Sequence, residues 1–262
     1  MIYAFSAAGL ARLDALIATG PLLAFDIDGT LAPIAQRPDD ARLPDDVQRR
    51  LGEIAQRASV AIITGRSVDD ARRMLSFEPR YLVGNHGAEG LPGWSMRSEA
   101  FAATVRQWRP TLAAAIALTD AGVLIEYKRY SLSLHFRGAA DPASACRAID
   151  RCIASLEPAP RIIAGKAVVN VLPADAPDKG DALRTLIGAE KSNNVLYVGD
   201  DDTDEAVFAL DLPGVLTLRV EPSQTSAAML FLRDQREVPA LIDRIAEQTT
   251  ILRANSRECQ MR

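Results

Sequence analysis

Two aspartates separated by one isoleucine follow an apolar run in the stretch Leu22–Pro33, LLAFDIDGTLAP. In an extended chain alternate side chains point the same way, so Asp26 and Asp28 can face one site while Ile27 turns into the core. Two carboxylates this close repel each other unless a cation lies between them, and Mg²⁺ suits such a hard oxygen site. Gly29 lets the backbone approach a ligand and leaves amide groups for phosphate oxygens. The pattern indicates phosphate chemistry at a metal site; an exposed turn is the alternative.

Three further polar motifs follow apolar runs or open a helix. Thr64-Gly65-Arg66 comes after VAII and offers a hydroxyl, an amide and a cation to a phosphate group. Lys179-Gly180 stands at a predicted helix start, where a lysine can neutralise a nucleophile and a phosphoryl group. The run GDDDTDE, residues 199–205, contains five acids and would repel strongly without a cation. Each motif alone is also explained by a turn or an exposed loop, so their weight comes from occurring together.

Short apolar runs alternate with helical patterns around these motifs. The predicted strands lie in 21–27, 59–66, 80–90, 193–199 and 214–220, and the predicted helices in 44–58, 67–76 and 179–189. Uninterrupted apolar strands that alternate with helices are typical of a parallel sheet covered on both faces, so we predict a Rossmann-like α/β core. Ligands of such sheets bind beyond the carboxyl ends of the strands, which is where all four motifs fall.

The pattern changes between residues 104 and 174. Residues 122–138 are typical of two strands with a tight turn near Arg129–Tyr130, a helix follows over about 142–156, and 161–173 is typical of a second hairpin turning at Gly165. We therefore predict an inserted α+β cap, 104–174, that divides the core into 1–103 and 175–262. Linkers are expected near Phe101–Pro110 and at Pro173–Asp178, and the polar tail after about Thr249 is expected to fray.

Composition excludes several classes of protein. The 262 residues carry a formal net charge of −4, which offers no electrostatic footprint for nucleic acid. No run of about 18 apolar residues occurs, so we expect no membrane span. Three cysteines without a C-x-x-C pair argue against a disulfide framework or a zinc site and favour a reducing cytoplasm. The apolar N-terminus is interrupted by Arg12 and Asp14, which is not typical of a signal peptide.

The order of the four motifs resembles the haloacid dehalogenase superfamily of phosphotransferases. The insertion also lies where that superfamily carries its second type of cap, between the threonine and lysine motifs. Within the superfamily, the segments DIDGTLAPI, TGRS, VGNHGAE, EYKRYSLSLHFR and YVGDDDTDEAVF look like those of the trehalose-6-phosphate phosphatases. The resemblance covers nearly the whole chain. It implies an Mg²⁺-dependent phosphatase that hydrolyses trehalose 6-phosphate.

The resemblance and the chemistry together suggest roles at the strand ends. Asp26 would attack phosphorus to give an aspartyl-phosphate, and Asp28 would protonate the leaving sugar oxygen and later deprotonate water. Mg²⁺ would be held by carboxylates of Asp26 and Asp200 and by the backbone carbonyl of Asp28. The groups expected to hold the phosphate or to orient these ligands are Thr64, Lys179, backbone amides near Asp28 and Gly65, Asp201 and Asp204.

By resemblance, the choice of sugar comes from the cap. The residues expected to contact the substrate are Gly65, Arg66, Asn85, His86, Glu126, Lys128, Arg137, Lys166 and Asn170. For the cap members, an ordinary charged strand face is the alternative. One position departs from the family: four residues after Lys166 the family usually carries a glutamate that accepts hydrogen bonds from sugar hydroxyls. Asn170 stands there, and it is shorter, neutral, and both donates and accepts.

Three functions remain open at this point. A trehalose-6-phosphate phosphatase leads. A related phosphatase acting on sucrose phosphate or on a glucosyl- or mannosyl-phosphoglycerate is favoured by Asn170, and an inactive sugar-phosphate-binding domain is opposed by the intact catalytic set. In each case the partner is a small sugar phosphate over which the cap is expected to close. We expect a cytoplasmic monomer.

Overall fold

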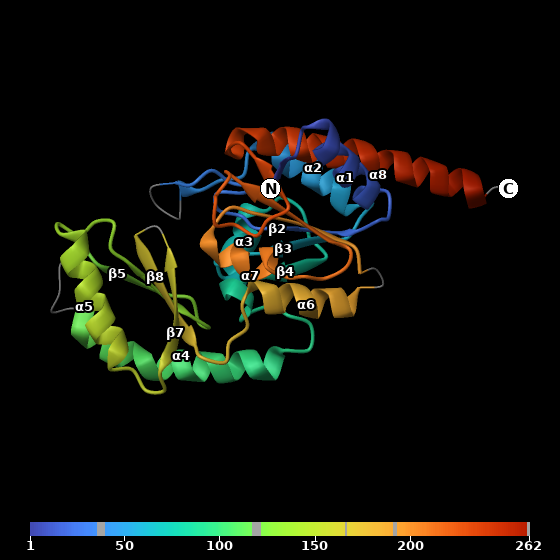
Figure 1. Cartoon of the computed structure of the whole chain (residues 1–262). Helices are drawn as coiled ribbons and strands as arrows, with labels where there is room; N and C mark the ends of the chain where they lie inside the picture. Colours follow the sequence, from blue (N-terminus) through green and yellow to red (C-terminus); the bar gives the residue numbers. More distant parts are fainter. Residues whose placement is uncertain (36–39, 117–121, 166, 191–192, 261–262) are drawn as a thin grey trace.

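The computed structural model describes residues 1–35, 40–116, 122–165, 167–190 and 193–260, with the side chains of 253–260 left aside. Lys166, expected at the substrate, lies outside the described residues. The chain forms two units, a large one built on a seven-stranded sheet and a small one built on a four-stranded sheet (Figure 1). Among the described residues, no helix is both long and apolar enough to cross a bilayer.

All pairings in the seven-stranded sheet are parallel, which confirms the predicted core. The strands, in spatial order, are β1 (Ile2–Tyr3), β11 (Leu230–Leu232), β10 (Val215–Val220), β9 (Val195–Gly199), β2 (Leu22–Phe25), β3 (Val60–Ile63) and β4 (Tyr81–Val83). Every residue of β2, β3 and β9 is buried, as expected for uninterrupted apolar strands covered on both faces. These three strands lie side by side at the centre, so the motifs that follow them meet at one edge.

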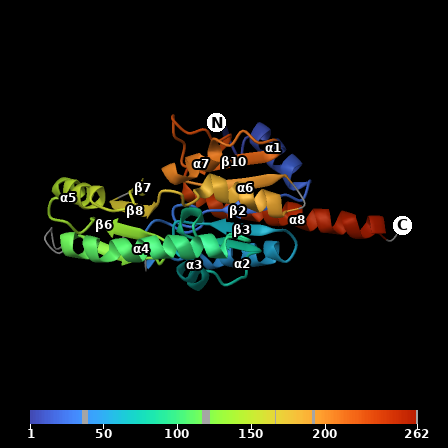
Figure 2. The ribbon, with the colours of Figure 1, turned by 90° about the horizontal axis from the view of Figure 1, so that it is seen from below.

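Helices cover both faces of this sheet, as Figure 2 shows from below. One face packs against α1 (Ala7–Ile17), α2 (Asp45–Ala55), α3 (Val68–Met74) and α8 (Val238–Gln260). The other packs against α6 (Lys179–Ala189) and α7 (Glu205–Phe208). The expectation of a frayed tail after Thr249 is wrong for the backbone, because α8 continues to Gln260.

The small unit is an antiparallel sheet with helices on one face. Its strands, in spatial order, are β5 (Leu124–Tyr127), β6 (Leu132–His135), β8 (Val168–Pro173) and β7 (Pro160–Gly165), and its helices are α4 (Ser95–Ile116) and α5 (Pro142–Ala154). Apolar residues of both helices and of alternate strand positions form one core. The predicted turn at Arg129–Tyr130 is confirmed, with Arg129 at φ 65°, and the second hairpin turns directly after Gly165.

The expected linker near Phe101–Pro110 is wrong, because these residues lie inside α4. Phe101, Val105, Trp108 and Leu112 recur at three- and four-residue spacing and are all buried. This apolar stripe holds the helix together through Pro110, whose ring would otherwise favour a break. The expected linker at Pro173–Asp178 agrees with the structure, because the residues between β8 and α6 form neither helix nor strand.

Candidate active site

Asp26 lies directly beyond the central strand β2. The amide of Asp26 donates to the carbonyl of Val198 at 2.9 Å and so continues the ladder with β9, and its side chain is buried. Ile27 lies in the core, as the alternation predicts. Gly29 has φ +80°, and a Cβ there would lie 2.0 Å from Oδ2 of Asp200. Only glycine therefore allows the turn after β2 to come this close to the loop after β9.

Lys179 joins two acids from different strand ends. It is the first residue of α6, whose start is fixed by reciprocal capping between Asp178 and Asp181. Its Nζ lies 3.1 Å from Oδ2 of Asp26 and 2.7 Å from Oδ1 of Asp204, with the side chain 2% exposed. Burial alone would lower the pKa of Lys179, but the charges of Asp204 and Asp26 raise it above its ordinary value. Lys179 is a charged ammonium held against Asp26.

Asp204 has hydrogen-bond donors on both carboxylate oxygens. Oδ1 accepts from Lys179 and from the hydroxyl of Tyr197 at 2.5 Å, and Oδ2 accepts from the amides of Asp200 and Asp201 at 2.9 and 3.0 Å. A fully buried carboxylate with four donors is a fixed structural anion. It holds the backbone of the acidic loop in place. Asp201 instead accepts from the amide of Asp202 and caps the short turn that follows.

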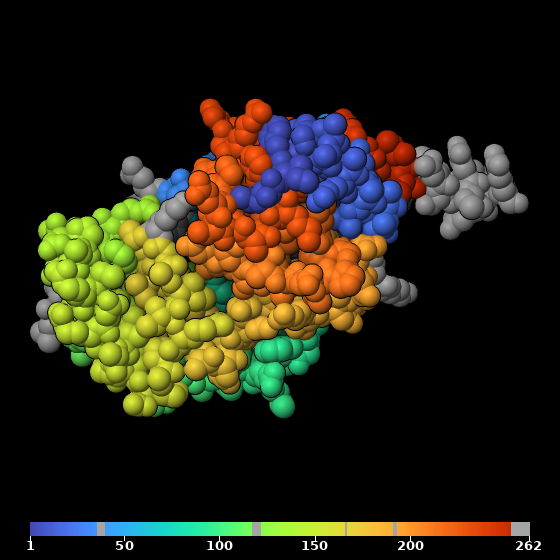
Figure 3. Space-filling model, in the orientation of Figure 1, coloured from blue at the N-terminus to red at the C-terminus, as the bar shows by residue number. Residues whose placement is uncertain are grey.

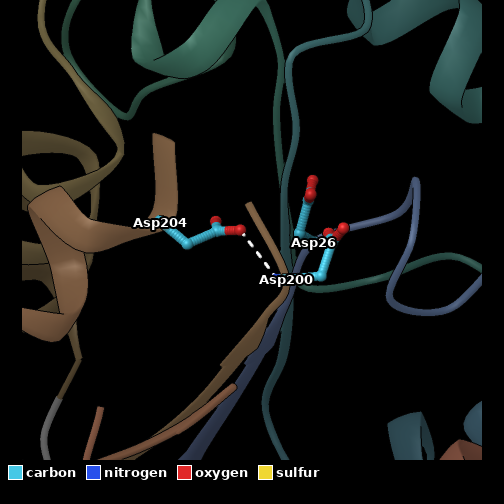
Figure 4. Close-up of side chains that lie close together, drawn as sticks. All are labelled: Asp26, Asp200 and Asp204. Atoms are coloured by element: carbon cyan, nitrogen blue, oxygen red, sulfur yellow. Dashed lines mark hydrogen bonds between the residues drawn. The ribbon is translucent and has the colours of Figure 1, made fainter. Parts of the chain in front are cut away.

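Oxygen atoms of Asp26, Asp200 and Asp204 lie within 4.8 Å of one another (Figure 4). Burial, followed by the neighbouring acids, raises the pKa of Asp26 well above its ordinary range and that of Asp200 to about 7. Oδ1 of Asp26 is buried and has no hydrogen-bond partner among the described residues. Because Asp204 is already occupied by four donors, the oxygens left for a cation belong to Asp26 and Asp200. The donor set fits a hard divalent ion.

Arg66 contacts Asp28. Its Nε and Nη2 each donate at 2.7 Å to an oxygen of Asp28, and Nη1 donates at 2.6 Å to Asp70. Its guanidinium is thus bonded to two carboxylates of the chain, and its expected contact with an anion of the substrate stays a prediction. Thr64, expected beside the phosphate, lies fully buried at the end of β3, with its hydroxyl accepting from the amide of Arg66 at 3.2 Å.

The loop Asn85–Gly87 of the large unit contacts the small unit. All three residues have positive φ, and Asn85 and His86 are buried. The side-chain Nδ2 of Asn85 donates to Glu89 at 2.7 Å and to the carbonyl of Lys128 at 3.3 Å, and its Oδ1 accepts from Ser131. Asn85 therefore binds the small unit, while a direct bond to substrate would compete with these contacts.

His86 packs against Gly65, where an added Cβ would lie 2.5 Å from its ring. Burial first, and then the nearby cations Lys179, Lys128 and Arg161, lower the pKa of His86 well below its ordinary value. The ring is therefore neutral, with one nitrogen protonated and one free to accept.

The small unit brings three of its expected residues together. Nζ of Lys128 donates to the carbonyl of Gly65 at 3.2 Å and lies 3.5 Å from Oε2 of Glu126, which also contacts His135 at 2.9 Å. Burial opposes ionisation of Glu126, but the hydrogen bond from His135 and the charge of Lys128 lower its pKa. Asn170 follows in the same cross-strand row and accepts from Ser133 at 2.6 Å.

Arg137 lies apart from this group, because its Nη1 donates to the carbonyl of Ala35 at 3.1 Å.

The sequence analysis missed several groups that the fold places at the site. Thr30 donates to Asp200 at 3.2 Å, Tyr197 donates to Asp204, and Arg161 lies beside His86. Thr30 follows the paired aspartates directly, so its position was the available signal; Tyr197 looks like an ordinary core residue.

A parallel sheet with an aspartate, a lysine and an acidic loop at its carboxyl edge, together with a second α+β unit, is the architecture of haloacid dehalogenase-type phosphatases. The family model for trehalose-phosphatase matches residues 24–229. The chain belongs to the trehalose-phosphatase family.

Known proteins agree with this assignment. A trehalose-phosphate phosphatase of Mycobacterium marinum is 30% identical over 261 residues, covering 93% of this chain and 66% of that protein, so the chain spans about two thirds of its relative. A trehalose-6-phosphate phosphatase of Aspergillus fumigatus superposes with a TM-score of 0.63 at 26% identity over 94% of this chain and 99% of that one. A trehalose-6-phosphate phosphatase related protein shares the fold, with a TM-score of 0.73 at 22% identity over 86% and 97% of the two chains.

Proposed function

We propose that the chain is an Mg²⁺-dependent phosphatase that hydrolyses trehalose 6-phosphate to trehalose and phosphate. The observation that carries the proposal is that Oδ1 of Asp26 is buried without a hydrogen-bond partner among the described residues, close to Lys179 and Asp200. A carboxylate oxygen without a donor is available both to a cation and to phosphorus. The family match supports the substrate.

The proposed reaction has two steps. In the first, a carboxylate oxygen of Asp26 forms a bond to phosphorus while the bond from phosphorus to the sugar oxygen breaks, and Asp28 gives its proton to that oxygen. In the second, water gives a proton to Asp28 and attacks phosphorus, and the bond to Asp26 breaks. Arg66 holds the carboxylate of Asp28 at the rim of the site between turnovers.

The metal would be held by carboxylates of Asp26 and Asp200 and by the backbone carbonyl of Asp28. When bound, it supplies positive charge that offsets the charge of the phosphate oxygens. Lys179 and the hydroxyl of Thr64 would bind the remaining phosphate oxygens, where transition-state charge is spread. Asp204 serves as the group that positions Lys179 and the acidic loop.

Residues 104–174 are proposed to act as the cap that selects the sugar. Glu126, Lys128 and Asn170 supply a carboxylate, an ammonium and an amide on one face, and Lys166 is proposed to contact the substrate as well. We further propose that the protein works as a monomer in the cytoplasm. Free thiols at Cys146 and Cys152 support a reducing compartment.

Phosphate release tests the proposal directly. Trehalose 6-phosphate, sucrose 6-phosphate, glucosyl-3-phosphoglycerate and glucose 6-phosphate are compared with Mg²⁺ and with EDTA, and Asp26→Asn is the control for contaminating phosphatase. We expect trehalose 6-phosphate to be preferred and EDTA to abolish release.

A second candidate is a phosphatase for another sugar phosphate, favoured by the neutral amide of Asn170 bonded to Ser133. Preference for any other member of the panel would select it. No release from any substrate by the folded protein would contradict both candidates and favour a binding domain.

A further inference from the structure

A cavity of about 230 Å³ lies between the two units, beside the acidic centre. Its walls come from β7 of the small unit, the Asn85–Gly87 loop, the start of α6 and the loop after β9. The residues used below are His86, Arg161, Asp178, Lys179, Asp202 and Thr203. Lys179 lines the cavity and also contacts Asp26, so the cavity borders the acidic centre. In Figure 3 the surface is hollowed where the yellow segment of the small unit meets the orange part of the large one.

Two nitrogen atoms on these walls are buried and unsatisfied. Nδ1 of His86 and Nε of Arg161 have no hydrogen-bond partner among the described residues, and His86 is only 7% exposed. A buried polar atom without a partner costs about 1–3 kcal/mol, so native structures rarely retain one without a ligand or water. The cavity is therefore lined with hydrogen-bonding capacity that the chain itself does not use.

The position of Arg161 is fixed by the sheet. Arg161 pairs with Leu172, and Ile163, two residues further on, pairs with Asn170. Because alternate residues of a strand share a face, Arg161 lies on the same side of the sheet as Asn170 and Glu126. Its Nη2 donates to the carbonyl of Pro177 at 2.9 Å, which anchors the guanidinium to the large unit. Arg161 thus extends the polar face of the small unit to the wall of the cavity.

The charge around the cavity favours an uncharged ligand. Lys179 is already neutralised by Asp26 and Asp204, so it adds little attraction for a second anion. Asp178 and Asp202 on the walls would repel a carboxylate and can accept from hydroxyl groups. Donors from Arg161, acceptors from the two aspartates and the hydroxyl of Thr203 match the mixed hydrogen bonding of a polyol.

We propose that Arg161 is a specificity-determining residue for the reaction, with its unsatisfied Nε donating to a hydroxyl group of the leaving group. The inference rests on the proposed phosphatase function and adds to it a residue outside the set expected to contact the substrate. Pockets for drug-sized ligands span about 300–1,000 Å³. This smaller cavity suits one ring of a disaccharide.

Steady-state kinetics of Arg161→Met test the inference. Trehalose 6-phosphate is compared with phenyl phosphate, whose leaving group has no sugar hydroxyls, and Arg151→Met on the exposed side of α5 is the matched control. Removal of a hydrogen bond from a charged donor should lower kcat/KM for trehalose 6-phosphate about 10- to 100-fold, mainly through KM. The ratio of kcat/KM for the two substrates should fall at least about tenfold in Arg161→Met and stay unchanged in Arg151→Met.

Equal losses of kcat/KM on both substrates would give Arg161 a merely structural role and overturn the inference. Unchanged kcat/KM values for both substrates would overturn it as well. If the wild type released phosphate from neither substrate, the proposed function would fail first. Binding of free trehalose, followed by saturation-transfer NMR, separates the two cases. Binding that the wild type shows and Arg161→Met loses supports the cavity even then, and binding that is equal in both or absent from both contradicts it.

Discussion

The acidic centre of the large unit and the polar face of the small unit differ in how their charges are held. Asp26, Lys179 and Asp204 are nearly or fully buried and bonded to one another. The Glu126 side chain is 41% exposed and that of His135 26%, and Oε2 of Glu126 contacts both Lys128 and His135. The charges of the first region are fixed by mutual contacts, whereas those of the second remain partly open to solvent.

This contrast agrees with the proposed division of roles, with the chemistry in the large unit and the choice of sugar in the small one. A buried network is costly to alter because each removed partner leaves another charge unpaired. A half-exposed face tolerates substitution, because water can take over a lost contact. The following tests begin with the changes expected to have the largest effect.

Asp26→Asn should give the largest loss of activity. Without the nucleophile, we expect kcat to fall by at least about 10³-fold, as for other covalent catalysts. The amide removes a buried acid whose ionisation is disfavoured, so the unfolding free energy without metal should not decrease. Near-normal turnover in a folded variant would remove Asp26 from the mechanism.

Lys179→Met and Lys128→Met compare the same substitution in the two regions. At position 179 the change leaves Asp26 and Asp204 buried without their cation, and breaking such a buried pair costs about 3–5 kcal/mol. At position 128 it removes one hydrogen bond between the units from a side chain that is 12% exposed, so we expect a smaller loss of about 1–2 kcal/mol, with a lower kcat/KM for the sugar phosphate. Urea denaturation measures both, and equal destabilisation would refute the contrast.

The acidic centre should make stability depend on pH and metal. The pKa of Asp200 is raised from 3.8 to about 7 and that of Asp26 is also raised, so the folded chain holds these protons at pH values where the unfolded chain has lost them. The contribution of Asp200 is therefore full below pH 3.8 and is lost as the pH rises through about 7, and the raised pKa of Asp26 acts in the same direction. Mg²⁺ should raise Tm by several degrees at pH 8 and by less at pH 5.

Asp200→Asn provides the control for that experiment. It should weaken both the decline with pH and the response to Mg²⁺, because it removes one titrating group and one proposed ligand. A Tm rise with Mg²⁺ that is equal in the variant and the wild type would place the ion elsewhere.

Glu126→Gln should have the smallest effect. The substitution keeps the shape of the side chain but loses the charge that faces Lys128 and His135. Because the group is partly exposed, we expect KM for the sugar phosphate to rise about 3- to 10-fold with little change in kcat. An effect on kcat alone would instead connect Glu126 to the chemistry of the large unit.

The sequence predicted most of the large sheet, since its central strands are uninterrupted apolar runs followed by polar motifs. It did not predict β1 or β11, because runs of two and three residues become strands only through their neighbours. The linker near Pro110 was misplaced for a related reason: proline is a local signal, whereas the buried stripe that continues α4 depends on a partner surface.

The site divides in the same way. Asp26, Lys179 and Asp200 could be brought together from the sequence because parallel strands end at one edge. The pairing of Arg66 with Asp28, and of Asn85 with Ser131, depends on side-chain conformations that spacing does not encode. Arg161 was missed because it stands in a cap strand of ordinary alternation, where only the register reveals its face.

Helix α4 begins beside the large unit and ends within the small one as a single element of 22 residues. Each residue of an α-helix turns the chain by about 100°, so one residue inserted into the shared stretch would swing the small unit around the helix axis. We therefore expect an insertion to be tolerated better in the loops at either end than within α4. Exchange of caps among relatives would have to preserve helical phase, which makes α4 a natural reference for choosing the points of fusion in chimaeras.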